Sequence, residues 1–239
     1  MKRHWPTLCL LIVNASSALA ERSSAVFLHP DGMGLNTWAA VRLWTAGADG
    51  RLAWDSLPRL AVYVGPMSDR VTASSNGGAT SHAWGVRADT GSYGFIEGQP
   101  IPKARSGATV TIMVEAMQAG KAVGIVNSAA VTEPGTGAFL AQVASRKDQE
   151  AIAAQILAAH PDVIFGGGEQ FFLPDGERGY HGVGVRKDGR NLIDEARRAG
   201  YHVVRTREEL AALPRGESRV LGLFAADNTF NEGTEESLA

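Results

Sequence analysis

The mature part of this sequence lacks cysteine. Among 239 residues the single cysteine is Cys9, and it lies inside an amino-terminal stretch with the features of an export signal. A chain without cysteine forms no disulfides, so its fold must depend on a packed core or on bound metal ions. No lipobox of the Leu-Ala-Gly-Cys type surrounds Cys9, and we therefore expect no lipid anchor.

The sequence also lacks an apolar run long enough to span a bilayer. Its longest amino-terminal run, Leu8–Val13, follows Lys2 and Arg3 and precedes small residues that end at Ala20. This order is typical of a secretory signal peptide over residues 1–20, and a buried first helix is the weaker alternative. We expect cleavage after Ala20 and a mature domain of residues 21–239 that is secreted or periplasmic, with no membrane anchor.

A large excess of charge of one sign is missing as well. The chain has 23 basic and 25 acidic residues, and no stripe of Lys and Arg. Nucleic acid is therefore excluded as an expected partner. The hydrophobic content of 44% is that of an ordinary globular protein, and the length suits one α/β domain or part of one.

Apolar strand-like runs alternate with segments of helical spacing along most of the chain. The alternation predicts an α/β fold with a doubly wound, mostly parallel sheet and helices on both faces. Between them, residues 88–102 are rich in glycine and are expected to form a loop. The expected strands are 24–30, 60–64, 122–126, 162–165, 201–204 and 220–224, and the expected helices are 36–46, 80–86, 109–119, 137–143, 147–160, 191–199 and 207–213.

Three polar loops follow expected elements and are expected to meet at one edge of the sheet. They are residues 31–34, 74–78 and 132–136. In parallel sheets ligands bind outside the carboxyl ends of the strands, where such loops lie. These loops are therefore the candidate site.

Asp31 and the two serines carry the chemistry of the first two loops. Asp31 precedes glycines, so its carboxylate could bind a divalent cation, or it could cap the next helix. Ser74 and Ser75 are candidate nucleophiles because a nearby metal ion can activate a hydroxyl group, although a helix cap is the simpler local interpretation. The residues leave open which hydroxyl among Thr72, Ser74 and Ser75 would react.

The third loop contains Glu133 and Thr136, and Arg146 follows ten residues after Thr136. Oxygen ligands such as these suit magnesium, whereas a solvated glutamate and a threonine cap are the alternatives. The Arg146 guanidinium could bind two phosphate oxygens at once, or it could be an ordinary surface arginine beside Lys147.

Five segments in this order resemble the alkaline phosphatase family over about residues 24–224. AVFLHPDGMG resembles its first metal loop, VTASSNGGATSHAWGVR its nucleophile segment, and VTEPGTGAFLAQVASR its magnesium loop. DVIFGGGEQFF and DGRNLIDEARRAGYHVVRTREEL are similar to two further stretches that carry no chemistry. The resemblance identifies Ser75 with the nucleophilic serine and Arg146 with the arginine that clamps phosphate.

The resemblance implies a hydrolase of phosphate monoesters with two Zn²⁺ ions and one Mg²⁺ ion. Ser75 would attack the ester and form a phosphoserine, which water then hydrolyses. Asp31 would bridge a zinc and the magnesium, while Glu133 and Thr136 would be magnesium ligands. A homodimer is compatible with the family.

The sequence departs from the family pattern in three respects. Ser74 stands where aspartate is usual, so we expect Arg146 to be held differently. Gly135 falls where a threonine is usual, which makes Thr136 a ligand only after a local shift. The remaining zinc ligands are expected beyond residue 239, so the carboxyl half of the domain is missing and residues 21–239 alone are expected to be poorly soluble.

Two other functional classes stay open at this point. One is an exported α/β chain that binds a cation or an anion without turnover, and we favour it for the activity of this chain alone because the remaining metal ligands are not in this sequence. The other is a related phosphodiesterase or sulfatase, although a sulfatase needs a Cys-x-Pro-x-Arg motif that the mature chain lacks.

Overall fold

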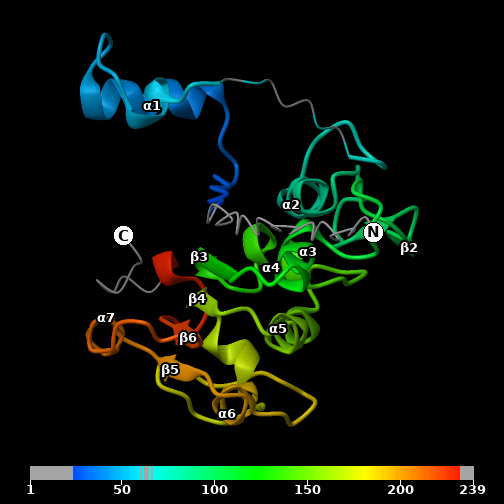
Figure 1. The fold of residues 1–239 in the computed structure, drawn as a ribbon, viewed down its shortest axis with the longest axis vertical. Helices are drawn as coiled ribbons and strands as arrows, with labels where there is room; N and C mark the ends of the chain where they lie inside the picture. The colour runs from blue at the N-terminus through cyan, green and yellow to red at the C-terminus, as the bar shows by residue number, and fades with distance from the viewer. Residues whose placement is uncertain (1–23, 60, 62–64, 66, 232–239) are drawn as a thin grey trace, which may run out of the picture.

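A four-stranded parallel sheet forms the centre of the protein. The computed structural model describes residues 24–59, 61, 65 and 67–231. The strand order is β3-β4-β6-β5 (Figure 1), and every pair is parallel. The strands are β3 (Gly124–Ala130), β4 (Val163–Gly167), β5 (His202–Val204) and β6 (Val220–Leu223).

Two helices, α5 (Gln149–Ala158) and α6 (Leu192–Arg198), cover one face of this sheet. Ile156 of α5 is fully buried in the same cluster as Ile164 of β4 and Leu221 of β6. Ile164 and Leu221 are direct neighbours in the strand register, so their side chains point to the same face.

The opposite face is covered by α7 (Arg207–Ala211). Val204, Val220 and Phe224 pack there with Leu210 of this helix. Gly222 has no side chain, which allows the Phe224 ring to approach its backbone closely. Helices therefore lie on both faces, and the predicted doubly wound α/β fold is confirmed.

A second group of helices lies beside β3, which is one edge strand of the sheet. It contains α2 (Ser75–Trp84), α3 (Ile112–Gln118) and α4 (Pro134–Leu140), with a small core around Trp84 and Phe139. The stretch that we predicted as a loop folds into a short hairpin of β1 (Phe95–Ile96) and β2 (Gln99–Pro100). The described part of the chain also contains three short 3₁₀ helices: η1 (Ala53–Ser56), η2 (Glu169–Phe172) and η3 (Thr229–Asn231).

The helix α1 (Leu35–Ala46) stands apart from this body and buries none of its residues. Trp44 is 91% exposed. Its contacts are local, because the Trp38 ring packs in a tilted arrangement 4.9 Å from the Trp54 ring and Arg42 binds Asp55 at 2.7 Å. This hydrogen bond with Arg42 holds the pKa of Asp55 below its ordinary value.

The predicted strand at residues 24–30 is wrong. This segment is extended, but it pairs with no described strand, and Val26 and Leu28 are more than 80% exposed. An apolar run becomes a strand only where a neighbour accepts its hydrogen bonds, and the structure gives this run none. The predicted strand at 60–64 and the signal peptide at 1–20 lie outside the described residues, apart from residue 61.

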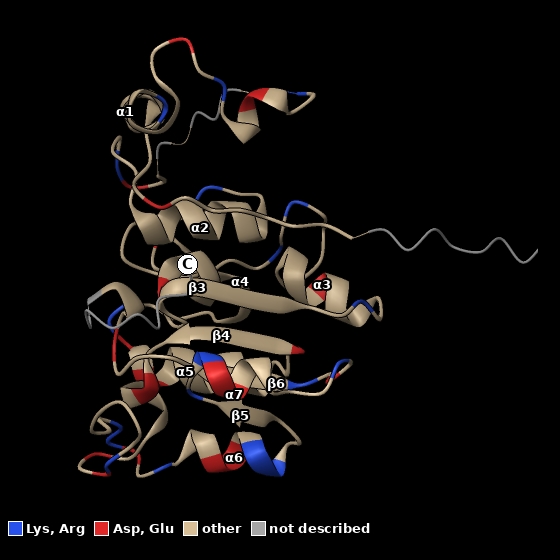
Figure 2. Ribbon diagram, turned by 90° about the vertical axis from the view of Figure 1, so that its left-hand side faces the viewer, with Lys and Arg blue, Asp and Glu red and all other residues tan. Residues whose placement is uncertain are grey.

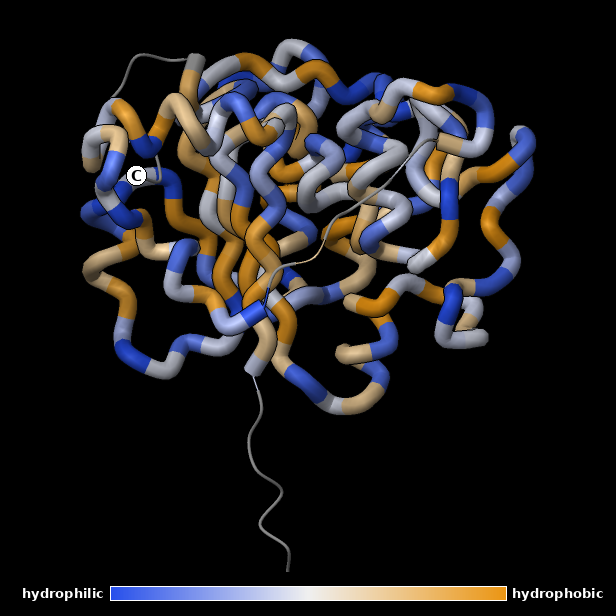
Figure 3. The backbone as a smooth tube through the Cα atoms, turned by 90° about the horizontal axis from the view of Figure 1, so that it is seen from above, coloured by the Kyte–Doolittle hydropathy of each residue, from blue (hydrophilic) through white to orange (hydrophobic). Residues whose placement is uncertain are grey.

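Hydrophobic residues gather on the central strands, and the surrounding segments are more polar (Figure 3). No helix in the described part of the chain is both long and apolar enough to cross a membrane.

Candidate active site

Ser75 is the first residue of α2, and the preceding serine caps this helix. The Ser74 hydroxyl oxygen accepts a hydrogen bond from the Gly77 backbone N–H at 3.3 Å. Capping uses the side chain of Ser74 and leaves that of Ser75 available. Thr72 lies before the helix and is exposed. The three hydroxyl groups that the sequence left open therefore have different surroundings.

The Ser75 hydroxyl donates a hydrogen bond to Asp31 Oδ1 at 2.8 Å, across 44 residues of sequence. Asp31 lies in the turn that follows the extended segment 24–30, and Gly32 in this turn has a positive φ of 65°. The structure thus brings together the aspartate and the serine that the sequence placed in separate loops.

Glu133 and Arg146 form an ion pair with Arg146 Nη2 at 2.6 Å from Glu133 Oε2. Glu133 lies at the amino end of α4, and Arg146 follows the carboxyl end of the same helix by a few residues. The expectation that Arg146 is held by something other than residue 74 agrees with this contact.

A short stretch of backbone, residues 91–93, connects the two parts of the site. Asn76, next to Ser75, donates a side-chain hydrogen bond to the Ser92 carbonyl at 3.1 Å. The Arg146 backbone N–H donates to the Gly91 carbonyl at 2.8 Å, and Tyr93 exchanges two backbone hydrogen bonds with Val143. The start of α2 and the Arg146 segment are therefore tied to the same three residues.

The pKa of Tyr93 is affected by the charged residues of the candidate site. Its ring is fully buried, and its hydroxyl donates to the Thr132 carbonyl at 3.0 Å. Burial raises the pKa of Tyr93 well above its ordinary value, the negative charges of Glu133 and Asp31 raise it further, and Arg146 lowers it. These three charged groups thus all affect the pKa of the same buried hydroxyl group.

Thr136 is engaged inside its own loop. Its hydroxyl donates to the Val131 carbonyl at 2.6 Å and accepts from Asn127 Nδ2 at 2.9 Å. The side chain is buried, and its hydroxyl serves the loop in this arrangement. Its role as a magnesium ligand stays a prediction.

Two histidines lie beside the candidate site. The rings of His29 and His82 are 5.1 Å apart in a T-shaped arrangement, and Phe27 lies 5.1 Å from His82. Burial lowers the pKa of His82, and the neighbouring His29 lowers it further. The sequence gave no reason to select them beyond their closeness to Asp31 and to the serines.

The donor atoms present suit part of a divalent cation site. The Asp31 carboxylate and the Ser75 hydroxyl offer hard oxygen atoms, which Mg²⁺ accepts and Zn²⁺ also binds. Among the described residues, however, there is no group of three or more His, Cys, Asp or Glu side chains that could hold a metal ion. The described part of the chain thus supplies a fraction of such a site.

The chain is similar to known phosphatases in sequence. The model of the family described as alkaline phosphatase matches residues 23–236. The streptomycin-6-phosphate phosphatase of Streptomyces griseus is 33% identical over 251 residues, covering 92% of this chain and 53% of that protein. The alkaline phosphatase of Gadus morhua is 30% identical and covers 87% of this chain and 52% of that protein. The chain thus spans about half the length of these curated relatives.

Solved structures agree with this similarity. A cold-active alkaline phosphatase from Shewanella superposes with a TM-score of 0.66 at 27% identity, over 83% of this chain and 45% of that one. The alkaline phosphatase of Thermus thermophilus gives 0.58 at 29% identity, over 70% of this chain and 31% of that one.

Proposed function

The chain belongs to the alkaline phosphatase family, and from this premise we propose that it carries the nucleophile half of a metal-dependent phosphate monoesterase. The observation that carries the proposal is the 2.8 Å hydrogen bond between Ser75 and Asp31. A helix-starting hydroxyl beside a carboxylate is the arrangement that a serine nucleophile and a cation ligand require.

In the proposed reaction the Ser75 oxygen attacks the phosphorus atom of the ester. A bond from Ser75 Oγ to phosphorus forms, the bond from phosphorus to the alcohol oxygen breaks, and the alcohol leaves with the proton that Ser75 gives up, so that a phosphoserine results. A water oxygen then bonds to phosphorus while the bond from phosphorus to Ser75 Oγ breaks, which releases inorganic phosphate and returns a proton to Ser75. Divalent cations bound at Asp31 would lower the pKa of the Ser75 hydroxyl and offset the charge of the phosphoryl group. Asp31 orients the hydroxyl, and the amino end of α2 directs backbone N–H groups to the phosphoryl oxygens.

Arg146 is the proposed phosphate-binding residue. One nitrogen of its guanidinium binds Glu133, and the group has further N–H donors that can bind two phosphoryl oxygens together. Glu133 is proposed to hold this arginine in place, and the cation-ligand role that the sequence suggested for Glu133 is the alternative. Transport out of the cytoplasm is proposed from the signal sequence alone.

A second candidate function is cation or anion binding without turnover. It is favoured by the small number of candidate ligands that meet in the described residues. Both candidates predict binding at Asp31, and they differ only in catalysis. Diester or sulfate hydrolysis would appear as activity on those esters above the activity on monoesters.

The test is hydrolysis of p-nitrophenyl phosphate by the purified chain with Zn²⁺ and Mg²⁺ supplied. We expect Ser75→Ala to lower the rate by about a thousandfold or more, whereas Thr72→Ala retains most of it. A chelator should abolish the activity, and acid quenching followed by mass spectrometry should find phosphate on Ser75. The absence of turnover at every metal concentration would favour binding alone.

A further inference from the structure

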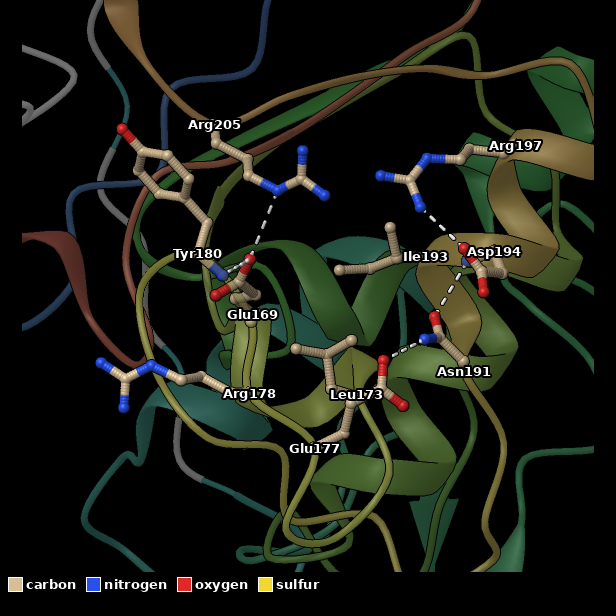
Figure 4. A pocket seen from close by; sticks show the side chains of 11 residues that line it. Glu169, Leu173, Glu177, Arg178, Tyr180, Asn191, Ile193, Asp194, Arg197 and Arg205 are labelled. Carbon is tan, nitrogen blue, oxygen red and sulfur yellow. Dashed lines mark hydrogen bonds and ion pairs between the residues drawn. The ribbon is translucent and has the colours of Figure 1, made fainter.

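A separate cavity of about 330 Å³ lies at the other end of the sheet from α2. It is lined by residues of η2, of the loop before α6, of α6 itself, and by Arg205 directly after β5 (Figure 4). No residue of the candidate active site lines it. Its volume is at the lower end of the range for small-molecule sites.

The segments that line the cavity follow the carboxyl ends of two strands. The loop before α6 comes after β4, and Arg205 comes directly after β5 (Figure 1). Ligands of parallel sheets bind outside the carboxyl ends of the strands, where such segments lie.

A buried carboxylate fixes one wall of this cavity. Glu169 is fully buried and accepts backbone hydrogen bonds from Tyr180 at 3.1 Å, His181 at 2.6 Å and Gly182 at 3.3 Å. Its Oε1 lies 3.6 Å from Arg205 Nε, which attracts the guanidinium without a hydrogen bond. Glu169 thereby positions Arg205 and has little capacity left for a ligand.

Arg205 contains an unsatisfied donor. Its Nε is buried and has no hydrogen-bond partner among the described residues, and its side chain is 22% exposed. Because this N–H group is buried against Glu169, a ligand in the cavity would bind the two terminal nitrogens of the guanidinium, which form no hydrogen bond with any other described residue.

Arg197 of α6 lies across the cavity from Arg205. Figure 4 shows the two guanidinium groups pointing toward one another over Ile193. Arg197 binds Asp194 at 2.7 Å through one nitrogen and is 46% exposed. Two like charges that face each other are stabilised when an anion lies between them.

The other acidic side chains of the cavity are already engaged. Glu177 accepts a hydrogen bond from Asn191 at 2.7 Å, and Asp194 is paired with Arg197. The basic and acidic residues near α6 are visible in Figure 2. Arg178 also lines the cavity, so three arginines and three carboxylates face it, and each of the carboxylates already accepts a hydrogen bond from another residue of the chain.

We propose that this cavity binds a small phosphate-containing anion between Arg197 and Arg205. A tetrahedral oxyanion offers several acceptor oxygens, which two guanidinium groups bind well. Leu173, Tyr180 and Ile193 line the same cavity and would contact the organic part of a phosphate ester. The proposal is independent of the chemistry at Ser75.

The test is calorimetric titration of the full chain with inorganic phosphate and, separately, with phenyl phosphate. All proteins carry Arg146→Gln, which removes the proposed phosphate-binding arginine of the active site. We expect this parent to keep one binding site, and we expect Arg205→Gln and Arg197→Gln each to weaken that site about tenfold. Tighter binding of phenyl phosphate than of inorganic phosphate would identify a phosphate ester as the ligand. Equal affinities would show that the cavity recognises the phosphate group alone.

Arg190→Gln is the matched control. Arg190 is also 46% exposed and also bound to an acidic residue, Glu195, but it lies outside the cavity. Arg197 is a surface residue, so its variant keeps the proposal testable even where Arg205→Gln lowers the melting temperature. The proposal is overturned by a parent that binds no phosphate, or by cavity variants that bind as tightly as the Arg190→Gln control. Loss of activity at Ser75 would leave this result unchanged.

Discussion

Two regions of the molecule have similar sequence patterns and very different surroundings. The helix α1 has apolar spacing over twelve residues and buries none of them. The helix α4 has seven residues, and six of them are buried between the sheet and its neighbouring helices. We predicted helices at 36–46 and at 137–143, and the second begins three residues earlier than predicted, inside the expected loop 132–136. Local sequence thus indicates that a helix forms, but it does not determine whether that helix has a partner.

The same contrast holds for extended segments. The run 24–30 is as apolar as β4, yet only β4 has a strand on each side, β3 and β6. In the first region, before residue 59, residues 35–56 depend on local contacts such as the Arg42–Asp55 ion pair, and residues 27–31 reach the rest of the molecule only through individual side-chain contacts. Residues after 88, in contrast, share continuous cores. The candidate site draws Asp31 from the first region and Arg146 from the second.

The largest expected effect is a difference between the two regions in how much a core substitution and a surface substitution change the free energy of unfolding. We expect Ile156→Ala to lower the free energy of unfolding by about 2–5 kcal/mol, because it leaves a cavity in the core. Leu43→Ala in α1 is the matched control and should change it by less than about 0.5 kcal/mol. Urea denaturation followed by circular dichroism measures both. A comparable loss in Leu43→Ala would mean that α1 has a packing partner in solution.

A substitution of Asp31 should reduce metal binding and leave the stability of the fold nearly unchanged. Because its side chain is exposed and its segment has no sheet partner, Asp31→Asn should leave the melting temperature within about 2 °C of the parent. The same change should weaken Zn²⁺ or Mg²⁺ binding at least about tenfold, because an amide is a poorer ligand than a carboxylate. Calorimetric titration with each metal measures the binding, and unaltered affinity would contradict the proposed ligand role.

A substitution of Glu133 tests whether this residue holds Arg146 in place. We expect Glu133→Gln to weaken inorganic phosphate binding at the active site by about fivefold, because Arg146 loses its charged partner. The matched control is Glu195→Gln, since Glu195 is also paired with an arginine and is similarly exposed, at 30% against 29%. A loss of Mg²⁺ affinity with unchanged phosphate affinity would instead support the cation-ligand role.

The smallest expected effect appears only in strong alkali. Burial raises the pKa of Tyr201 from its ordinary value of 10.0 to about 12, and its hydroxyl donates to the Pro161 carbonyl at 2.5 Å. The unfolded chain therefore ionises first, and the stabilisation is complete below pH 10 and is lost between about pH 10 and 12. Stability should fall less steeply over this window in Tyr201→Phe than in the parent, as urea titrations at several pH values would show.

Much of the second region follows from local sequence. We predicted a helix at 191–199, and α6 occupies Leu192–Arg198. Asn191 caps it by accepting from the Asp194 N–H at 2.9 Å, and Gly200 after it has a positive φ of 86°. Signals of this kind act within a few residues, so a single sequence contains them.

The first region was predicted less well because its outcome depends on distant neighbours. Nothing in SAVFLHP distinguishes a strand with partners from an extended segment without them. The pairing of Ser75 with Asp31 was expected from the family resemblance, and the structure brings these two residues into contact. The pairing of Glu133 with Arg146 was not expected, because it depends on how α4 turns between them over thirteen residues.

Residues 91–93 have a consequence for how this site tolerates change. Their backbone carbonyl groups accept a hydrogen bond from the Asn76 side chain and another from the Arg146 backbone N–H. On the arginine side the link joins main-chain atoms only, whereas on the nucleophile side it depends on the Asn76 side chain. Substitutions elsewhere in α2 leave both links in place, but replacement of Asn76 removes the side-chain hydrogen bond that ties the nucleophile segment to residues 91–93.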